Sequence, residues 1–321
     1  MSNLPKVFVT RSFWPDVLKQ LFDIAKVDVW QNDGPPPSAT LAEKCSDANG
    51  LLCLLTDRID RELLDQCPNL KVISQMAVGV DNIDLAACRD RNIPVGNTPG
   101  VLAETTADLT FALILSSGRR IVEADAFVRT GKWKTWSPDL LVGPDIHHAT
   151  IGIVGMGAIG LEVARRAHGF RMEILYASRS RNMRVEAEYG AKYVPLQELC
   201  NLSDFVTVHV ALTPETKHIL GEPEFNLMKP SAVVINTARG DVVDQSALII
   251  ALQSQRIWGA GLDVFSKEPL AMDSPLFHLP NVTLLPHIGS ASITTRRRMA
   301  QLAVANLIAG LIGEPLPHQV T

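Results

Sequence analysis

Residues 150–160 read TIGIVGMGAIG, a β-rich run followed by three glycines in the spacing G-x-G-x-x-G and then by a stretch with helical spacing. In such a strand-loop-helix unit, Gly155 permits the tight turn, Gly157 lets a pyrophosphate approach the backbone, and Gly160 lets the helix pack closely on the strand. The helix N-terminus adds N–H groups and the positive end of the helix dipole. The stretch predicts a dinucleotide-binding βα unit, in which Ala158 and Ile159 complete the loop. A glycine turn with a structural role only is the alternative.

Strand and helix patterns alternate on both sides of this loop. Six candidate strands occupy the second half of the chain, and their number suits a doubly wound dinucleotide-binding sheet. They are Thr150–Val154, Glu173–Ser178, Phe205–Val210, Ala232–Asn236, Gly259–Val264 and Val282–Leu285. Five more precede it, namely Lys6–Thr10, Lys26–Trp30, Gly50–Leu55, Lys71–Met76 and Pro94–Asn97. This alternation predicts an α/β protein with parallel sheets covered on both faces.

Three further segments complete the predicted organisation. Residues 104–120 form a long apolar-rich helix with apolar residues on more than one face, so we expect another element or another subunit to cover it. Residues 122–148, which include Trp133 and Trp136, predict an ordered segment outside the alternating strands and helices rather than a flexible linker. Residues 293–313 read as one long helix, and too little chain follows to build a third domain.

Composition excludes several classes of protein. The 321 residues carry a formal net charge of −4, which gives no electrostatic reason to expect nucleic acid or an acidic membrane as a partner. The charge-free stretches at residues 146–161 and 299–313 fall short of the roughly 18 apolar residues of a membrane helix. The N-terminus lacks a secretory pattern. Five cysteines without a Cys-x-x-Cys pair indicate reduced thiols in the cytoplasm and no structural zinc, and we expect no metal site.

The strand after the glycine loop ends without the carboxylate that NAD-preferring sites commonly use on the ribose. Its end reads Ser178, Arg179, Ser180 and Arg181. Two guanidinium groups would attract the 2′-phosphate of NADP through charge-assisted hydrogen bonds. The sequence therefore predicts a preference for NADPH, with NADH possible as a substitute. The alternative is that both arginines decorate a solvated loop.

Polar residues follow the fourth, fifth and sixth strands of the second series, at the edge where open α/β sheets bind ligands. They are Arg239, then Asp263 and Glu268, then His287. Reduction of a 2-keto acid needs such a set, because arginine can clamp the carboxylate while an imidazolium donates a proton. A neighbouring carboxylate would keep the imidazole charged near neutral pH. Taken singly, Arg239 could be a turn residue and Glu268 a surface acid.

Other histidines fit the site less well. His147 and His148 form a loop pair without a third metal ligand, and we expect them to be solvated or structural. His209 lies on an apolar strand, so we expect an interior residue with its hydrogen bonds satisfied.

Five ordered segments together carry a resemblance that covers nearly the whole chain. They are QMAVGVDNID (75–84), GMGAIG (155–160), HILGEPEFNLMKPSAVVINTARGDVVD (218–244), GAGLDVFSKEPL (259–270) and LLPHIGSA (284–291). These motifs resemble those of the D-isomer-specific 2-hydroxyacid dehydrogenases. The resemblance implies that Arg239 binds substrate, that Glu268 is the partner of the histidine, and that His287 is the proton donor. It implies further substrate contacts at Leu55, Val78, Gly79, Ser290 and Trp136, the backbone N–H groups of Val78 and Gly79 receiving the carboxylate. It also implies cofactor contacts at Thr237, Ala238, Asp263, His287 and Gly289, beside the glycine loop and residues 178–181.

Within that family the chain looks most like the glyoxylate and hydroxypyruvate reductases. The segments LLCLLTDRID (51–60), GKWKTWSPDLLVGPDI (131–146) and ILYASRSR (174–181) carry this likeness. In that subgroup a tryptophan equivalent to Trp136 borders the active site of the partner subunit, which implies a homodimer. Plain interface packing is the alternative for Trp133 and Trp136. Ala211 departs from the proline of many relatives, which should affect loop stiffness more than chemistry.

The resemblance implies a Rossmann cofactor domain inserted in a flavodoxin-like substrate domain. Residues 1–98 and 288–321 would form the substrate domain and 99–287 the cofactor domain, with a dimerisation segment at about 104–148. The expected activity is NADPH-dependent reduction of glyoxylate and hydroxypyruvate to glycolate and D-glycerate. Reduction of another 2-keto acid, such as a keto-sugar acid or an aromatic one, is an alternative. A nucleotide-sensing binding protein similar to the family's co-repressors is the alternative from another class.

Overall fold

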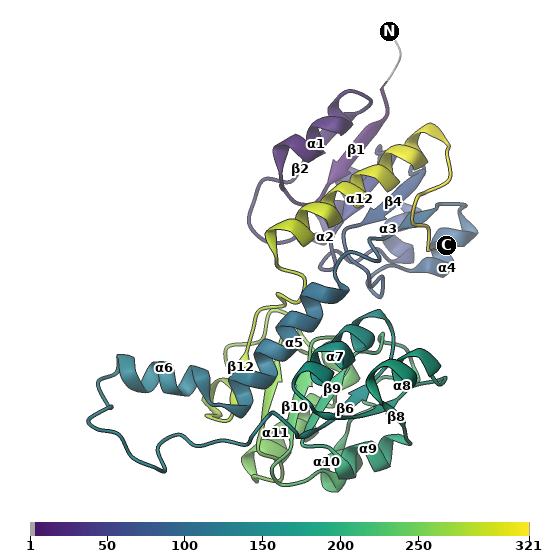
Figure 1. The fold of residues 1–321 in the computed structure, drawn as a ribbon. Coiled ribbons are helices and arrows are strands. Elements are labelled where there is room, and N and C mark those ends of the chain that lie inside the picture. The colour runs from purple at the N-terminus through teal and green to yellow at the C-terminus, as the bar shows by residue number, and fades with distance from the viewer. Residues whose placement is uncertain (1–3, 321) are drawn as a thin grey trace. The chain divides into compact units, whose positions relative to one another are not determined.

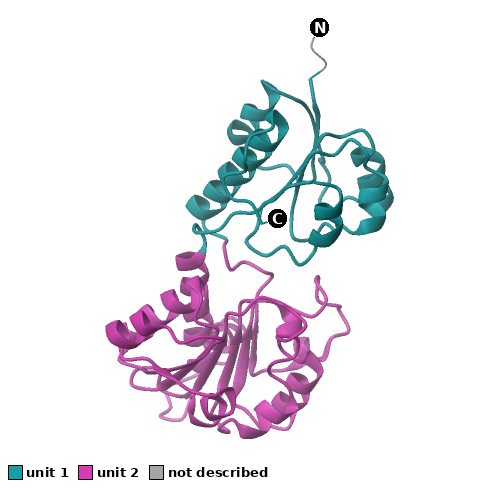
Figure 2. Cartoon of the chain, turned by 90° about the vertical axis from the view of Figure 1, so that its right-hand side faces the viewer, with its two compact units in different colours: residues 1–102, 291–321 teal, residues 103–290 magenta. Residues whose placement is uncertain are grey.

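The computed structural model describes residues 4–320, and the chain divides into two compact units (Figure 2). Unit 1 comprises residues 1–102 with 291–321, and unit 2 comprises residues 103–290. These boundaries lie at 102 and 290, whereas the sequence analysis placed the domain boundaries at 98 and 287. The roles of the two units as substrate domain and cofactor domain stay predictions.

Unit 1 contains a parallel sheet in the order β2-β1-β3-β4-β5, the flavodoxin-like order (Figure 1). The strands are β1 (Lys6–Val9), β2 (Lys26–Val29), β3 (Gly50–Cys53), β4 (Val72–Gln75) and β5 (Val95–Gly96). Alternate residues of the strands face opposite layers. Val7 and Leu52 pack under α1 (Pro15–Phe22) and α12 (Ile293–Ile312). Phe8 and Leu51 belong to the apolar cluster of α2 (Ser38–Cys45), α3 (Arg61–Asp65) and α4 (Leu85–Asp90). Burial on both faces explains why β3 reads as an unbroken apolar run, whereas the edge strand β2 is half exposed and contains Lys26 and Asp28.

Unit 2 contains a parallel sheet in the order β12-β11-β10-β9-β6-β7-β8, which is the doubly wound order of a Rossmann domain. The strands are β6 (Thr150–Val154), β7 (Glu173–Ala177), β8 (Lys192–Tyr193), β9 (Phe205–Val208), β10 (Val233–Asn236), β11 (Gly259–Leu262) and β12 (Val282–Leu284). The sequence predicted six strands here, and that number is wrong by β8. This strand has two exposed residues at the sheet edge, so it carries no apolar pattern.

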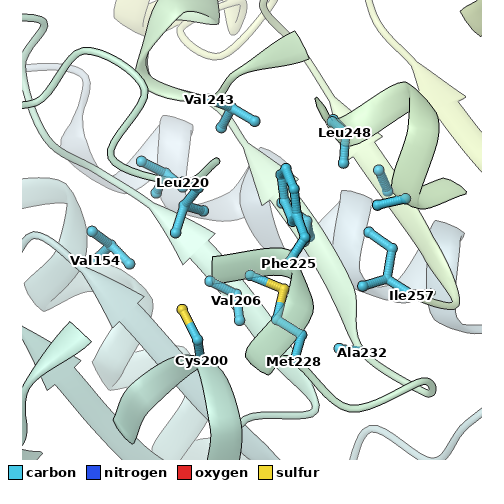
Figure 3. Close-up of a cluster of buried hydrophobic side chains, with 14 of the residues drawn as sticks. Val154, Cys200, Val206, Leu220, Phe225, Met228, Ala232, Val243, Leu248 and Ile257 are labelled. Carbon is cyan, nitrogen blue, oxygen red and sulfur yellow. The ribbon is translucent and has the colours of Figure 1, made fainter. Parts of the chain in front are cut away.

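Helices cover both faces of the sheet in unit 2. One face packs against α5 (Ala103–Gly118), α7 (Ala158–Gly169) and α8 (Met183–Tyr189), whose apolar residues share one cluster with Ile151 and Ile153. The other face packs against α9 (Leu196–Leu202), α10 (Glu222–Leu227) and α11 (Gln245–Gln253). Figure 3 shows this second cluster around Phe225 and Met228. Short 3₁₀ turns lie at Gly240–Val242 and Pro275–His278.

The long helix α5 packs on α7 and on β11, so another element of unit 2 covers it as expected. The excursion after it begins with α6 (Ile121–Arg129), none of whose residues is buried. Residues 130–149 continue without regular structure, and Figure 1 shows α6 and this segment reaching away from the sheet of their unit. We call residues 119–148 the arm. Among residues 4–320, no helix is long and apolar enough to cross a membrane.

Candidate active site

The carboxyl ends of strands β6, β10, β11 and β12 in the sheet of unit 2 define the candidate site. β10 pairs with β11 so that Asn236 lies opposite Leu262, and β11 pairs with β12 so that Leu262 lies opposite Leu284. Because parallel strands end at one edge, the residues that follow them are carried to the same edge. The glycine loop follows β6 of the same sheet.

The glycine loop has the geometry that its spacing predicts. Gly155 has φ +100°, and a Cβ there would lie 2.7 Å from the carbonyl oxygen of His209. A Cβ on Gly160 would lie 2.1 Å from the carbonyl oxygen of Gly155, so only glycine lets α7 approach the strand. Gly157, which caps α7, has open space where its side chain would be. This open backbone at a helix N-terminus fits the pyrophosphate of a dinucleotide.

The two arginines of the loop after β7 differ in their surroundings. The Arg181 guanidinium pairs with Glu186 of α8 at 2.5 Å, and the hydroxyl of Tyr176 donates to the same carboxylate at 2.5 Å. The hydrogen bond from Arg181 holds the pKa of Glu186 below its usual value. Arg179 and Ser180 are exposed. The attraction of a 2′-phosphate by both guanidinium groups stays a prediction, and in the structure Arg181 has a carboxylate partner.

The turn after β10 is built by a residue that the sequence analysis did not single out. Asn236 is buried, donates from Nδ2 to the carbonyl of Arg239 at 2.8 Å and accepts from the N–H of Ala238 at 3.0 Å. The Thr237 hydroxyl shares a hydrogen bond of 3.0 Å with Thr110 of α5. An asparagine at the end of a strand is a signal for such a turn, and it could have been recognised from the sequence.

His287 and Glu268 form the central pair of the site. Nδ1 of His287 lies 2.7 Å from Oε2 of Glu268, and Oε1 of Glu268 accepts from the N–H of Phe265 at 3.0 Å. Burial raises the pKa of Glu268. The opposing effects are larger and leave this pKa below its usual value: they are the hydrogen bond and charge of His287, the N–H of Phe265 and the charge of Arg239. The structure thus brings together the carboxylate and imidazole that the sequence placed 19 residues apart.

Asp263 holds the loop that carries the histidine. It is fully buried, and its two carboxylate oxygens accept the N–H groups of Ile288 and Gly289, each at 2.7 Å. Its carbonyl accepts the N–H of His287 at 2.9 Å, and His287 itself has φ +56°. Burial raises the pKa of Asp263, and the two N–H groups and His287 partly oppose that rise. Asp263 therefore positions His287 in addition to the cofactor role that the resemblance implies.

The expectation that His209 has its hydrogen bonds satisfied is wrong, although its ring is buried as expected. Both ring nitrogens are buried, and among the described residues neither has a hydrogen-bond partner. Burial lowers the pKa of His209 to about 3, so the ring is neutral at physiological pH.

The remaining predicted contacts lie elsewhere. Leu55 follows β3 and the pair Val78–Gly79 follows β4, all in unit 1. Ser290 is the last residue of unit 2, and Trp136 lies on the arm with 76% of its surface exposed. The roles of these residues stay predictions. No group of three or more His, Cys, Asp or Glu in residues 4–320 could hold a metal ion.

Residues 111–289 match the family model described as D-isomer specific 2-hydroxyacid dehydrogenase, NAD binding domain. The chain belongs to the D-isomer-specific 2-hydroxyacid dehydrogenase family. It is 49% identical to a glyoxylate reductase of Korarchaeum cryptofilum over 98% of this chain and 96% of that protein. A glyoxylate reductase of Thermococcus litoralis is also 49% identical, with the same coverage.

Solved structures of the family have the same fold. A crystal structure of an NADPH-dependent glyoxylate/hydroxypyruvate reductase of Sinorhizobium meliloti, in complex with NADP and malonate, matches with a TM-score of 0.87 and 32% identity. The match covers 99% of this chain and 97% of that one. The resemblance of the five motifs to this family is therefore confirmed, and the chain is an α/β enzyme with a nicotinamide-cofactor domain.

Proposed function

We propose that the protein is an NADPH-dependent reductase that converts glyoxylate to glycolate and hydroxypyruvate to D-glycerate. The observation that carries the proposal is the 2.7 Å contact of His287 with Glu268, at the sheet edge that also carries Arg239. Two relatives named glyoxylate reductase, at 49% identity, support glyoxylate as the substrate. The Sinorhizobium protein, named for both substrates, supports hydroxypyruvate.

Arg239, His287 and Glu268 have separate roles in the proposed reaction. The guanidinium of Arg239 holds the substrate carboxylate and polarises the keto oxygen. When bound, the reduced nicotinamide supplies the hydride to the keto carbon. His287 gives its proton to the keto oxygen as the alkoxide forms, and because Nδ1 contacts Glu268, Nε2 is the ring atom that donates. Glu268 carries a negative charge and stabilises the imidazolium before transfer.

The preference for NADPH rests on the loop after β7. Residues 178–181 contain no carboxylate, and exposed Arg179 is available to a 2′-phosphate. The next acid after this loop, Glu186, is already paired with Arg181, so it is a poor partner for a ribose hydroxyl. NADH remains a weaker substitute in this proposal.

A homodimer formed through the arm completes the proposal. On α6, Ile121, Val122 and Val128 are each more than half exposed, and Trp133 and Trp136 follow with 57% and 76% exposed. A cavity of about 720 Å³ lies between this helix and the loops at the other end of the sheet, with Val122 and Ala126 on one side and Trp258 and Pro280 on the other. So much exposed apolar surface on one segment is typical of a protein interface. We place the enzyme in the cytoplasm because all five cysteines are free.

A panel of 2-keto acids assayed with NADPH and with NADH tests this function. We expect the highest kcat/KM with glyoxylate or hydroxypyruvate and NADPH. The His287→Ala and Arg239→Ala proteins should lose turnover, whereas His147→Ala, which changes an exposed loop histidine, should not. Preference for a keto-sugar acid or an aromatic keto acid, or tight nucleotide binding without turnover, would replace the proposal by one of the alternatives above.

A further inference from the structure

The segment that follows β4 in unit 1 presents two successive backbone N–H groups with a defined direction. The carbonyl of Ala77 accepts the N–H of Thr98 at 2.9 Å, and the carbonyl of Val78 accepts Nδ2 of Asn97 at 2.9 Å. In a planar trans peptide the C=O and the next N–H point in opposite directions. The N–H groups of Val78 and Gly79 therefore point away from residues 97–98.

Within residues 4–320, neither of these N–H groups donates a hydrogen bond. Backbone donors are commonly paired in a folded protein, so two unpaired neighbours on one side of a loop suit an external acceptor with two oxygens. Val78 is 39% exposed, which leaves the acceptor access to the loop. A carboxylate has the required shape and charge.

Asn97 is itself held from two directions. Its N–H donates to the carbonyl of His318 at 3.1 Å, and its carbonyl accepts Nδ2 of Asn306 at 2.8 Å. Asn306 is fully buried on α12, and its Oδ1 accepts the N–H of His318 at 3.0 Å. A Cβ at Gly96 would lie 2.7 Å from the side chain of Asn306, so glycine is required for this approach.

The C-terminal segment continues this support along β5. Gly96 forms an antiparallel bridge with Gln319, and the N–H of Val320 donates to the carbonyl of Val95 at 2.8 Å. The buried side-chain amide of Asn306 on α12 thus connects His318 to Asn97, the residue that binds the Val78 carbonyl.

We propose that Asn97 is a positioning residue for the substrate carboxylate, and that Asn306 with residues 318–320 holds Asn97 in place. By fixing the Val78 carbonyl, Asn97 directs the N–H groups of Val78 and Gly79 toward the carboxylate. The inference rests on the proposed function, because it takes a 2-keto acid as the ligand. Asn97 touches neither the reacting carbon nor the cofactor in this scheme, so its loss weakens substrate binding and leaves the chemical step intact.

The Asn97→Asp protein tests the proposal, because aspartate has nearly the same shape but presents oxygen in place of the donor Nδ2. We expect the KM for glyoxylate to rise about tenfold, the effect of losing one oriented hydrogen bond, with kcat and the NADPH dissociation constant within about twofold. Asn97→Ala, which adds no charge, should also raise this KM. With glyoxal, an aldehyde without a carboxylate, kcat/KM should be unchanged in both proteins.

Asn49→Asp is the matched control. Asn49 is also half-buried in unit 1 and donates from Nδ2 to a backbone carbonyl, that of Asn69 at 3.2 Å, but it precedes β3 and so lies at the opposite edge of the sheet. Its KM for glyoxylate should match that of the unmodified protein. Thermal unfolding of all variants identifies any that fail to fold, and Asn97→Ala remains informative if the aspartate does not fold.

An unchanged KM for glyoxylate in folded Asn97 variants would overturn the inference and leave the proposed function standing. An equal loss of kcat/KM with glyoxal would also overturn it, because general damage to unit 1 would then be the cause. Failure of the unmodified protein to reduce glyoxylate would instead contradict the proposed function, and this inference with it.

Discussion

Replacing Glu268 by glutamine should move the falling limb of the pH profile for reduction to lower pH. The two side chains contact at 2.7 Å, and a hydrogen bond to a charged partner contributes about 1.5–3 kcal/mol. At about 1.36 kcal/mol per pH unit, this corresponds to a displacement of about one to two units. Since 23% of His287 and 26% of Glu268 remain exposed, water weakens the attraction, and we expect about one unit.

The sign follows from the charge on Glu268. Its pKa is lowered in the folded protein, so the carboxylate is ionised across the pH range in which a histidine titrates. Glutamine keeps the size and an acceptor oxygen but removes that charge, so the falling limb of the profile should move to lower pH.

The assay is kcat/KM for glyoxylate at saturating NADPH across the acid and alkaline range. Glu198→Gln, which changes an exposed carboxylate on α9, should leave the profile unchanged. A falling limb that stays in place in Glu268→Gln, or moves to higher pH, would refute the role of this carboxylate in keeping the proton donor charged.

Three other substitutions address separate parts of the site. Arg179→Ala should raise the KM for NADPH about tenfold or more and leave the KM for NADH unchanged. Arg181→Ala should raise the KM for NADPH by less, because Arg181 is paired with Glu186. Equal effects on the KM values of both cofactors would exclude recognition of the 2′-phosphate. Asp263→Asn places an N–H donor against an N–H of the loop that carries His287. Thermal denaturation should therefore show a free energy of unfolding lower by about 1–3 kcal/mol, and kcat should fall. An unchanged free energy of unfolding would contradict the role of Asp263 in holding this loop. Trp136→Ala should raise the KM for glyoxylate if the arm reaches the partner's site, whereas a normal KM in a protein that sediments as a dimer would favour interface packing.

The sequence was most informative at the ends of the parallel strands. The central strands β9, β10 and β11 are buried on both faces, so the apolar run of each ends where the chain reaches the carboxyl edge and ligand-binding residues begin. That regularity places Arg239 and His287 after β10 and β12 without any knowledge of side-chain positions. The glycine loop was equally clear in the sequence, because close backbone contacts at Gly155 and Gly160 exclude every larger residue there.

Features that depend on contacts through space were not visible in the sequence. The pairing of Arg181 with Glu186 and Tyr176 depends on how α8 packs beside β7, and no local pattern indicates it. The strand β8 and the bridge between Gly96 and Gln319 involve too few residues to show periodicity. The contact of Asn306 with Asn97 joins residues 209 positions apart, which only the packing of α12 on the sheet brings together.

The rate of NADPH oxidation by glyoxylate, measured for the unmodified protein and for His287→Ala, tests the central claim most directly. We predict turnover by the unmodified protein and a loss of about a hundredfold or more in the variant, since a positioned general acid contributes about that much. The NADPH dissociation constant, followed by fluorescence, should be the same in both. No turnover by the unmodified protein, or a normal rate in His287→Ala, would contradict the assignment of this protein as a glyoxylate reductase with His287 as its proton donor.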